Sequence, residues 1–126
     1  MKKIINTPKA PAPIGPYNQA ILSGDTLYIS GQIPIDPSTG TLVEGDIKKE
    51  TARSMENLKA ILEAAGMDFG QVVKSSIFIK DMGQFGMINE VYGSYFDGDT
   101  APARETVQVA KLPMNVNVEI SMIAVK

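Results

Sequence analysis

The residues best suited to chemistry lie near the C-terminus, in the stretch PARETVQVAKLPMNVNVEI at positions 102 to 120. It contains two runs that alternate as half-buried strands do, and each run carries a charge, Arg104 in the first and Glu119 in the second. The guanidinium of Arg104 can hold a carboxylate through two parallel hydrogen bonds, and the carboxylate of Glu119 can accept a proton or hold a water molecule. A cross-strand ion pair that only fixes strand register would explain the same charges. The pattern leaves both interpretations open.

The composition narrows the chemistry that these residues can take part in. The chain contains no cysteine and no histidine, which excludes disulfides, thiolate nucleophiles, cysteine zinc sites and every catalytic arrangement built on an imidazole. Any reaction must therefore use Glu, Asp, Arg, Lys, Tyr or backbone groups. With 12 basic and 14 acidic side chains the formal net charge is -2, the reverse of the usual charge of a nucleic-acid-binding protein.

Length and composition are those of an ordinary globular domain. The chain has 126 residues, of which 44% are apolar and 21% are charged, so we expect a single domain over residues 1–126. No run of eighteen apolar residues and no signal-peptide pattern occurs, and we therefore expect a cytoplasmic protein that does not engage a membrane.

Two amphipathic helices are predicted. Asp46 can cap the first, whose apolar positions recur every three or four residues until Gly66 ends it. The second covers roughly residues 84–96. The predicted buried stripes are Ile47, Thr51, Met55, Leu58, Leu62 and Ala65 on the first helix, and Phe85, Ile88, Tyr92 and Tyr95 on the second.

The remaining apolar runs predict about five strands. They are residues 17–23 and 25–31 as a hairpin, residues 72–80 between the helices, and two strands near residues 104–110 and 116–125. The proline-rich stretch before Tyr17 is predicted to be an extended arm, and residues 33–45 a loop. The order β-β-α-β-α-β-β predicts an α+β fold, a sheet with both helices on one face.

The last two strands are predicted to pair antiparallel, so that their polar residues share the sheet face opposite the helices. The predicted pairs are Val109 with Val116, Val107 with Val118, Thr106 with Glu119, and Arg104 with Ser121. Ile123 and Val125 are apolar residues on this uncovered face, which favours self-association. We therefore expect a homo-oligomer that encloses Arg104 and Glu119 at a subunit boundary.

At these residues the sequence resembles the reactive intermediate deaminase (RidA) family, also called YjgF or L-PSP and earlier described as translation inhibitors or endoribonucleases. The resemblance covers almost the whole chain, and the last matching segment carries the family signature, an Arg after Pro-Ala and a Glu in the terminal strand. The matching segments are APIGPYNQA, YISGQIPIDPSTG, NLKAILEAAG, KDMGQFGMINEVY and PARETVQVAKLPMNVNVEI.

The resemblance implies a chorismate-mutase-like mixed sheet with two helices on one face, assembled as a homotrimer with active sites in the clefts between subunits. It also implies hydrolysis of 2-aminoacrylate and related enamines, through their imine tautomers, to 2-oxo acids and ammonia. The family uses no cofactor, and the mechanism needs no metal ion. An imine carbon is already electrophilic, so a positioned water and a carboxylate proton relay can suffice in a chain without histidine.

Site residues follow from the resemblance position by position. Arg104 would bind the substrate carboxylate, and Glu119 would position the attacking water and relay its proton. The other pocket positions of the family correspond to Tyr17, Ser30, Gly31 (through its backbone) and Asn89.

Several of these residues also have structural interpretations. Tyr17 can be an amphipathic anchor, Ser30 a strand terminator and Asn89 a solvent-facing helix residue. The chain departs from the family at Thr106, where many members carry a cysteine. If only the backbone at Thr106 contacts the substrate, activity survives the change; if the thiol tunes the pocket, specificity changes.

Two other functions remain open at this stage. The older family names imply an endoribonuclease or a translation inhibitor, which the acidic net charge and the absence of histidine disfavour. A sensor or carrier of small carboxylate metabolites would use the same Arg104 fork without turnover. The sequence does not separate that function from an enzyme, because binding and catalysis begin with the same contact.

Overall fold

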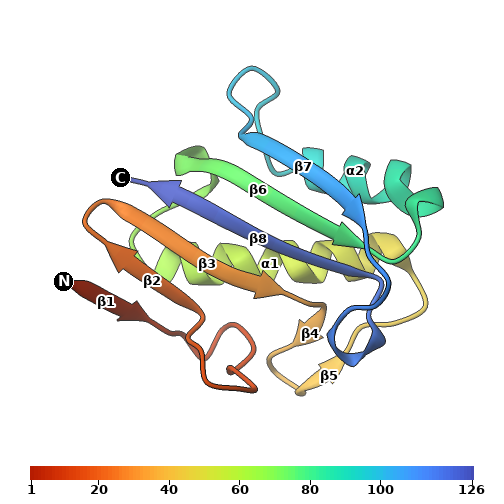
Figure 1. The fold of residues 1–126 in the computed structure, drawn as a ribbon, viewed down its shortest axis with the longest axis horizontal. Helices are drawn as coiled ribbons and strands as arrows, with labels where there is room; N and C mark the ends of the chain where they lie inside the picture. Colours follow the sequence, from red (N-terminus) through yellow and green to blue (C-terminus); the bar gives the residue numbers. More distant parts are fainter.

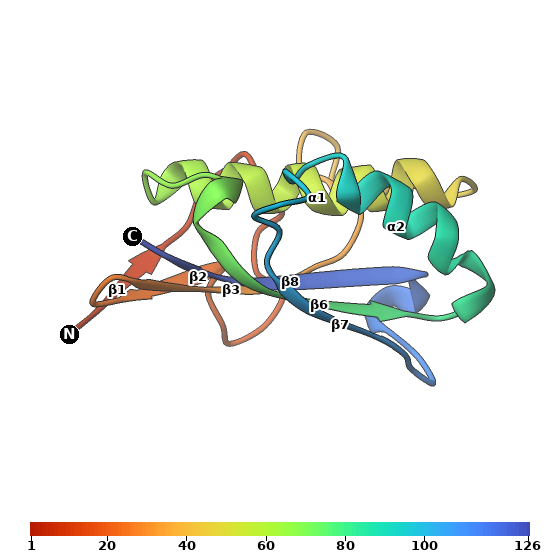
Figure 2. The same cartoon turned by 90° about the horizontal axis from the view of Figure 1, so that it is seen from above.

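A computed structural model describes all 126 residues as a six-stranded sheet with two helices on one face (Figure 1). The view from above shows both helices on the same side of the sheet (Figure 2). The strands are β1 (Lys2–Ile5), β2 (Ala20–Ser23), β3 (Thr26–Gln32), β6 (Val72–Ile79), β7 (Ala103–Gln108) and β8 (Val118–Val125), and the helices are α1 (Ile47–Ala64) and α2 (Phe85–Gly93). The predicted α+β fold with both helices on one face is confirmed.

The strands lie in the order β1-β2-β3-β8-β6-β7, with β6 and β7 parallel and every other pair antiparallel. A separate two-stranded sheet joins β4 (Ile35–Asp36) to β5 (Thr41–Leu42). Three short 3-10 turns complete the structure, η1 (Phe69–Gln71), η2 (Met82–Gln84) and η3 (Pro113–Asn115). No helix combines the length and the apolar character that a membrane span needs.

Helix α1 forms as its sequence predicts. The Asp46 side chain accepts hydrogen bonds from the backbone N–H groups of Lys48 and Lys49 at 3.0 and 3.3 Å, and Gly66 adopts a φ of 72° just beyond the helix. All six predicted stripe residues are buried. The buried face is wider than predicted, because it also includes Glu50, Ser54, Asn57 and Ile61.

Helix α2 is shorter than the predicted residues 84–96. Asp81 caps the 3-10 turn η2 through a hydrogen bond from the backbone of Gly83, and α2 continues from that turn to Gly93. The predicted stripe does face the core. Ile88 is fully buried, and the Tyr92 hydroxyl bonds the hydroxyl of Ser75 on β6 at 2.9 Å.

The predicted pairing of the last two strands is wrong. Strand β7 pairs with β6, in parallel, and β6 separates it from β8. The reason is that β6, α2 and β7 form a strand–helix–strand crossover, which returns the chain parallel to β6. Alternation of apolar and polar residues shows which side chains share a face of a strand, but it does not determine which strand lies next to it. After β7 the chain crosses the end of β6 to reach β8, as Figure 1 shows.

Three short strands were not predicted. Strand β1 lies before the proline-rich stretch that was predicted to be an extended arm, and it pairs with β2 from Lys2 opposite Ser23 to Ile5 opposite Ala20. Strands β4 and β5 lie in the segment expected to be a loop. Each is two to four residues long, which is too short for a clear alternation pattern.

The face of the sheet away from the helices carries a row of apolar side chains. Cross-strand register aligns Ile4, Ile21, Tyr28 and Ile123 across β1, β2, β3 and β8. Ile4 is 54% exposed and Tyr28 is 51% exposed, and no helix lies on this face of the sheet (Figure 2). The prediction of apolar residues on an uncovered face is therefore confirmed, and the predicted homo-oligomer would bury them.

Asn57 joins α1 to the chain beyond β3, and it provides a test of the fold. Its side-chain amide donates to the backbone carbonyls of Ile33 and Ile35 at 3.2 and 3.0 Å, and its side chain is fully buried. Asn57→Ala removes two buried hydrogen bonds and leaves the carbonyl of Ile33 with only its 2.8 Å bond from the backbone N–H of Ile35, so we expect the free energy of unfolding to fall by about 2 to 4 kcal/mol in denaturant titrations. Lys59→Ala, at an exposed position of the same helix, is the control and should change it by less than about 0.5 kcal/mol. Equal effects of the two substitutions would contradict this role.

Candidate functional site

The residues singled out from the sequence fall into two groups in the structure. The first group lies where the proline-rich arm meets β3 and β8, and contains Tyr17, Ser30, Gly31 and Glu119. These four residues line one cavity of about 380 Å³ together with three apolar residues, Ile14, Ile33 and Pro113. The cavity thus combines a carboxylate and a hydroxyl with an apolar wall, the usual composition of a small-molecule site.

Gly31 makes room for the carboxylate of Glu119. The register between β3 and β8 shifts between Ile29 and Gln32, so Ser30 and Gly31 lie in an irregular stretch of the ladder. A Cβ atom at Gly31 would stand 2.7 Å from both Cδ and Oε2 of Glu119. Any larger residue at position 31 would have to displace the carboxylate, which explains a glycine inside this strand.

Ser30 and Tyr17 hold the arm against the cavity. The Ser30 hydroxyl donates to the backbone carbonyl of Asn18 at 2.7 Å, and the Ser30 N–H donates to the carbonyl of Gln19 at 2.9 Å. The Tyr17 hydroxyl accepts a long hydrogen bond of 3.4 Å from the backbone of Ile14. Ser30 therefore does more than terminate a strand, and Tyr17 is anchored with its ring 46% exposed beside the cavity.

Glu119 has no charged partner within the chain. The two ion pairs of the structure are Lys48 with Glu90 and Lys74 with Glu105, so the cross-strand pair of Glu119 with Arg104 does not form. Partial burial without a compensating cation raises the pKa of the Glu119 carboxyl above its ordinary value. A carboxyl in this condition can take up and release a proton closer to neutral pH than an exposed one.

The second group lies on β7 and α2. The guanidinium carbon of Arg104 stands 5.5 Å from the ring centroid of Phe85 and 5.2 Å from that of Tyr92, and Nη1 donates to Oδ1 of Asn89 at 2.6 Å. Two aromatic rings and one amide thus orient the guanidinium, and its other donors are free for an anion. Asn89 is exposed but binds Arg104, which the solvent-facing interpretation did not anticipate.

Thr106 stands two residues after Arg104, and its hydroxyl is buried without a hydrogen-bond partner. In the register of β7 it lies beside Ile77 of β6, a fully buried core residue. The hydroxyl therefore lies on the helix face of the sheet, shielded from solvent.

The two groups are not brought together within one chain. Arg104 lies beside the buried Ser75 and contacts α2, so its side chain is on the helix face of the sheet. Glu119 lies beside Phe78, three positions further along β6, and points to the opposite face. The prediction that Arg104, Thr106 and Glu119 share the uncovered face is therefore wrong, because it depended on direct pairing of β7 with β8.

Some residues at these sites were not anticipated as functional. The sequence assigned Phe85 and Tyr92 to the core stripe of α2, although their rings also carry the Arg104 guanidinium. The spacing of apolar residues predicts the buried stripe of α2. It does not show that two rings of this stripe also contact an arginine on β7. No three side chains of the metal-binding types Asp, Glu, His or Cys converge anywhere in the structure.

The raised pKa of Glu119 predicts a stability change that depends on pH. Because the pKa is higher in the folded than in the unfolded chain, the protonated carboxyl favours folding at low pH, and this contribution is lost as pH rises through the folded pKa. Glu119→Gln removes the half-buried charge, so the variant should melt at a higher temperature than the wild type at pH 7 and at the same temperature near pH 4. Glu44→Gln, at an exposed carboxylate, is the control. A wild type that is more stable than Glu119→Gln at pH 7 would contradict the assignment.

The unpartnered hydroxyl of Thr106 predicts that its removal stabilises the fold. Thr106→Val keeps the shape and deletes the unsatisfied group, so the free energy of unfolding should rise by about 1 kcal/mol. Thr51→Val is the matched control, because the Thr51 hydroxyl donates to the carbonyl of Ile47 at 2.7 Å and its loss should destabilise the chain. Destabilisation by Thr106→Val in denaturant titrations would mean that the hydroxyl has a partner.

Comparison with known proteins identifies relatives that match the chain over almost its whole length. Residues 7–126 match the family model described as Endoribonuclease L-PSP. A RutC family protein of Pyrococcus horikoshii is 54% identical over 126 residues, which is 100% of this chain and 99% of that protein. A mouse protein named 2-iminobutanoate/2-iminopropanoate deaminase is 50% identical, over 100% of this chain and 93% of its own length.

Solved structures show the same fold. The Yersinia pestis protein YyfA of the conserved Rid family superposes with a TM-score of 0.97 at 46% identity, covering 100% of both chains. Escherichia coli TdcF with bound serine superposes with a TM-score of 0.92 at 46% identity, covering 98% of both chains. Sequence and structure agree on one group of proteins, and the chain belongs to the RidA/YjgF/L-PSP family.

Proposed function

We propose that the chain hydrolyses 2-imino acids, such as the imine tautomer of 2-aminoacrylate, to 2-oxo acids and ammonia, at a site shared between the subunits of a homotrimer. The observation that carries the proposal is the presence of two complementary half-sites on opposite faces of one sheet. One offers a guanidinium with free donors, and the other an unpaired, partly buried carboxylate. Neither Arg104 nor Glu119 can reach the other in one chain, so a single substrate must meet them from two chains.

Self-association supplies the second chain in this proposal. The apolar row on the uncovered sheet face, which includes Ile4 and Tyr28, favours association of copies. In a closed ring each subunit presents one face to one neighbour and a different surface to the other, as a heterologous interface requires. Such a ring can bring the Arg104 group of one copy to the Glu119 cavity of the next.

Arg104 would bind the substrate carboxylate through two donors, while Asn89 and the rings of Phe85 and Tyr92 keep the guanidinium in place. Water held by Glu119 attacks the imine carbon. As the C–O bond forms, the carboxylate of Glu119 accepts a proton from that water, and it then passes the proton to the nitrogen. Glu119 then takes the hydroxyl proton of the resulting carbinolamine and delivers it to the nitrogen as the C–N bond breaks, which releases ammonia and leaves the carbonyl of a 2-oxo acid. The raised pKa of Glu119 suits a group that must both accept and donate.

Relatives support the same reaction class. Mouse and rat proteins named 2-iminobutanoate/2-iminopropanoate deaminase are 50% and 48% identical to the chain. Both names describe short 2-imino acids. In this proposal the Arg104 guanidinium binds the carboxylate of such an acid, and the Glu119 cavity of about 380 Å³ receives the rest of it.

A second candidate function is binding of small amino or oxo acids without turnover. The serine bound to Escherichia coli TdcF favours it, because serine carries the same carboxylate but is not an imine. Mixing excess protein with freshly generated 2-aminoacrylate separates the two functions. A deaminase speeds the appearance of pyruvate and ammonia, whereas a carrier protects the ligand.

RNA cleavage, which the family description names, is disfavoured by a net charge of -2 and by the absence of histidine.

Arg104→Lys tests the proposed role of the guanidinium. Lysine keeps the charge but loses the planar pair of donors, so kcat/KM for 2-aminoacrylate should fall roughly thirtyfold to hundredfold, equivalent to about 2 to 3 kcal/mol. The melting temperature and the mass in sedimentation equilibrium, about three chains, should remain those of the wild type.

Arg53→Lys is the matched control for that experiment. Arg53 lies on α1 outside both half-sites and binds Asn57, so the same chemical change there should leave kcat/KM unaltered. Near wild-type turnover by a folded Arg104→Lys protein would remove Arg104 from the site, and a monomeric wild type would remove the shared cleft.

A further inference from the structure

Ile14 occupies a singular position in the structure, because it is the only residue that lines all three of the cavities around the proline-rich arm. On one side of it lies the candidate substrate cavity of about 380 Å³. On the other lies a second cavity of about 460 Å³, formed by Thr7, Pro8, Ala10, Pro11, Ala12, Ile35, Pro37 and Gly40. This second cavity contains no charged residue.

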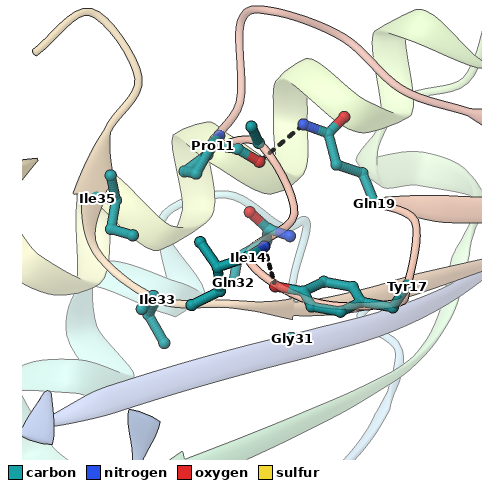
Figure 3. A pocket seen from close by; sticks show the side chains of 9 residues that line it. Pro11, Ile14, Tyr17, Gln19, Gly31, Gln32, Ile33 and Ile35 are labelled. Carbon is teal, nitrogen blue, oxygen red and sulfur yellow. Dashed lines mark hydrogen bonds between the residues drawn. The ribbon is translucent and has the colours of Figure 1, made fainter. Parts of the chain in front are cut away.

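The space between the two large cavities is narrow while Ile14 is in place. It measures about 30 Å³, room for roughly one water molecule, and it shares lining residues with both neighbours. Figure 3 shows the Ile14 side chain in this gap, between the ring of Tyr17 and the side chains of Ile33 and Ile35. A substrate side chain in the first cavity therefore meets Ile14 before it can reach the second.

The backbone that carries Ile14 is held at both ends. The buried side chain of Gln19 donates to the carbonyls of Thr7, Ala10 and Pro11 and accepts from the N–H of Thr7, which fixes the start of the arm. The Tyr17 hydroxyl accepts from the N–H of Ile14, and prolines at positions 11, 13 and 16 restrict the chain between these contacts. Ile14 is thus presented on a stiff segment.

Ile14 does not act as a core residue. Its side chain is 67% exposed, whereas Ile33 and Ile35 opposite it are each 8% exposed. The exposed side chain of Ile14 is therefore held in a proline-restrained segment at the border of two cavities and is not part of the packed core.

We infer that Ile14 is a specificity-determining residue, the wall that closes the candidate substrate cavity against the second, apolar cavity and so limits the size of the substrate side chain. This inference rests on the proposed function. Imines with short side chains fit in front of Ile14, and imines with branched, longer apolar side chains collide with it. Shortening residue 14 joins the two cavities and admits the longer chains, since the walls beyond it are apolar.

The test compares wild type, Ile14→Val and Ile14→Ala on two imines generated by an amino acid oxidase, one from alanine and one from leucine. The ratio of kcat/KM for the leucine imine to that for the alanine imine should rise by about tenfold or more in Ile14→Ala, with Ile14→Val in between. Met87→Ala is the control, because Met87 is 41% exposed on α2, lines none of the cavities and lies outside the apolar row of the uncovered sheet face, and its ratio should equal that of the wild type.

Calorimetric binding of two 2-oxo acids, pyruvate and 4-methyl-2-oxopentanoate, gives a readout that does not require turnover. Ile14→Ala should strengthen binding of the larger acid relative to the smaller by a similar factor. An unchanged ratio in both assays, or an equal loss on both ligands, overturns the role of Ile14. If the wild type accelerates hydrolysis of neither imine, the proposed reaction is wrong, but the ratio of dissociation constants still tests Ile14. If neither 2-oxo acid binds, both the proposed function and the role of Ile14 are overturned.

Discussion

The position of β6 between β7 and β8 determines where the two charged residues Arg104 and Glu119 lie in this protein. Because β6 is inserted there, Arg104 and Glu119 are two strands apart, and the register also places their side chains on opposite faces of the sheet. An intramolecular ion pair is thereby prevented, so each charge remains available. In the proposed function, the same separation gives each chain two half-sites, and an assembly of copies is the simplest way to bring them together.

The cavity that contains Glu119 is built from features that cost free energy of folding. Glu119 is partly buried without a cation, and Gly31 interrupts a strand to admit it. Beside the same cavity the chain turns through two consecutive non-glycine residues with positive φ, Met114 at 55° and Asn115 at 56°, directly after Pro113. The amine of Lys80 donates to Asn115 at 2.8 Å and helps to hold this turn. Strained turns of this kind concentrate at functional sites, where the surrounding structure enforces them.

Much of the fold could be predicted from the sequence, because its longest elements have strong local signals. Helix α1 is specified by residues that are close in the sequence. They are the cap at Asp46, the apolar stripe with its regular spacing, and Gly66 with its positive φ. The partner of β7 is decided by a crossover through α2, which alternation cannot reveal. The role of Asn89 could not be seen either, because its hydrogen bond to Arg104 joins a helix to a strand 15 positions away. Ser30 and Gly31, which the family resemblance supplied as candidate site residues, lie on a strand that the sequence predicts, whereas the relation of Arg104 to Glu119 depends on the order of the strands.

The central claim, that one site takes Arg104 from one chain and Glu119 from another, can be tested by mixing two inactive variants. Arg104→Ala and Glu119→Gln should each form assemblies that deaminate 2-aminoacrylate very slowly. When the two are unfolded together and refolded as mixed assemblies, about one quarter of the interfaces regain both native residues. We predict recovery of about that fraction of wild-type activity in the mixture, and none when the variants are refolded separately and then combined without exchange of subunits. Mixed assemblies that remain as inactive as their parents would contradict the shared site.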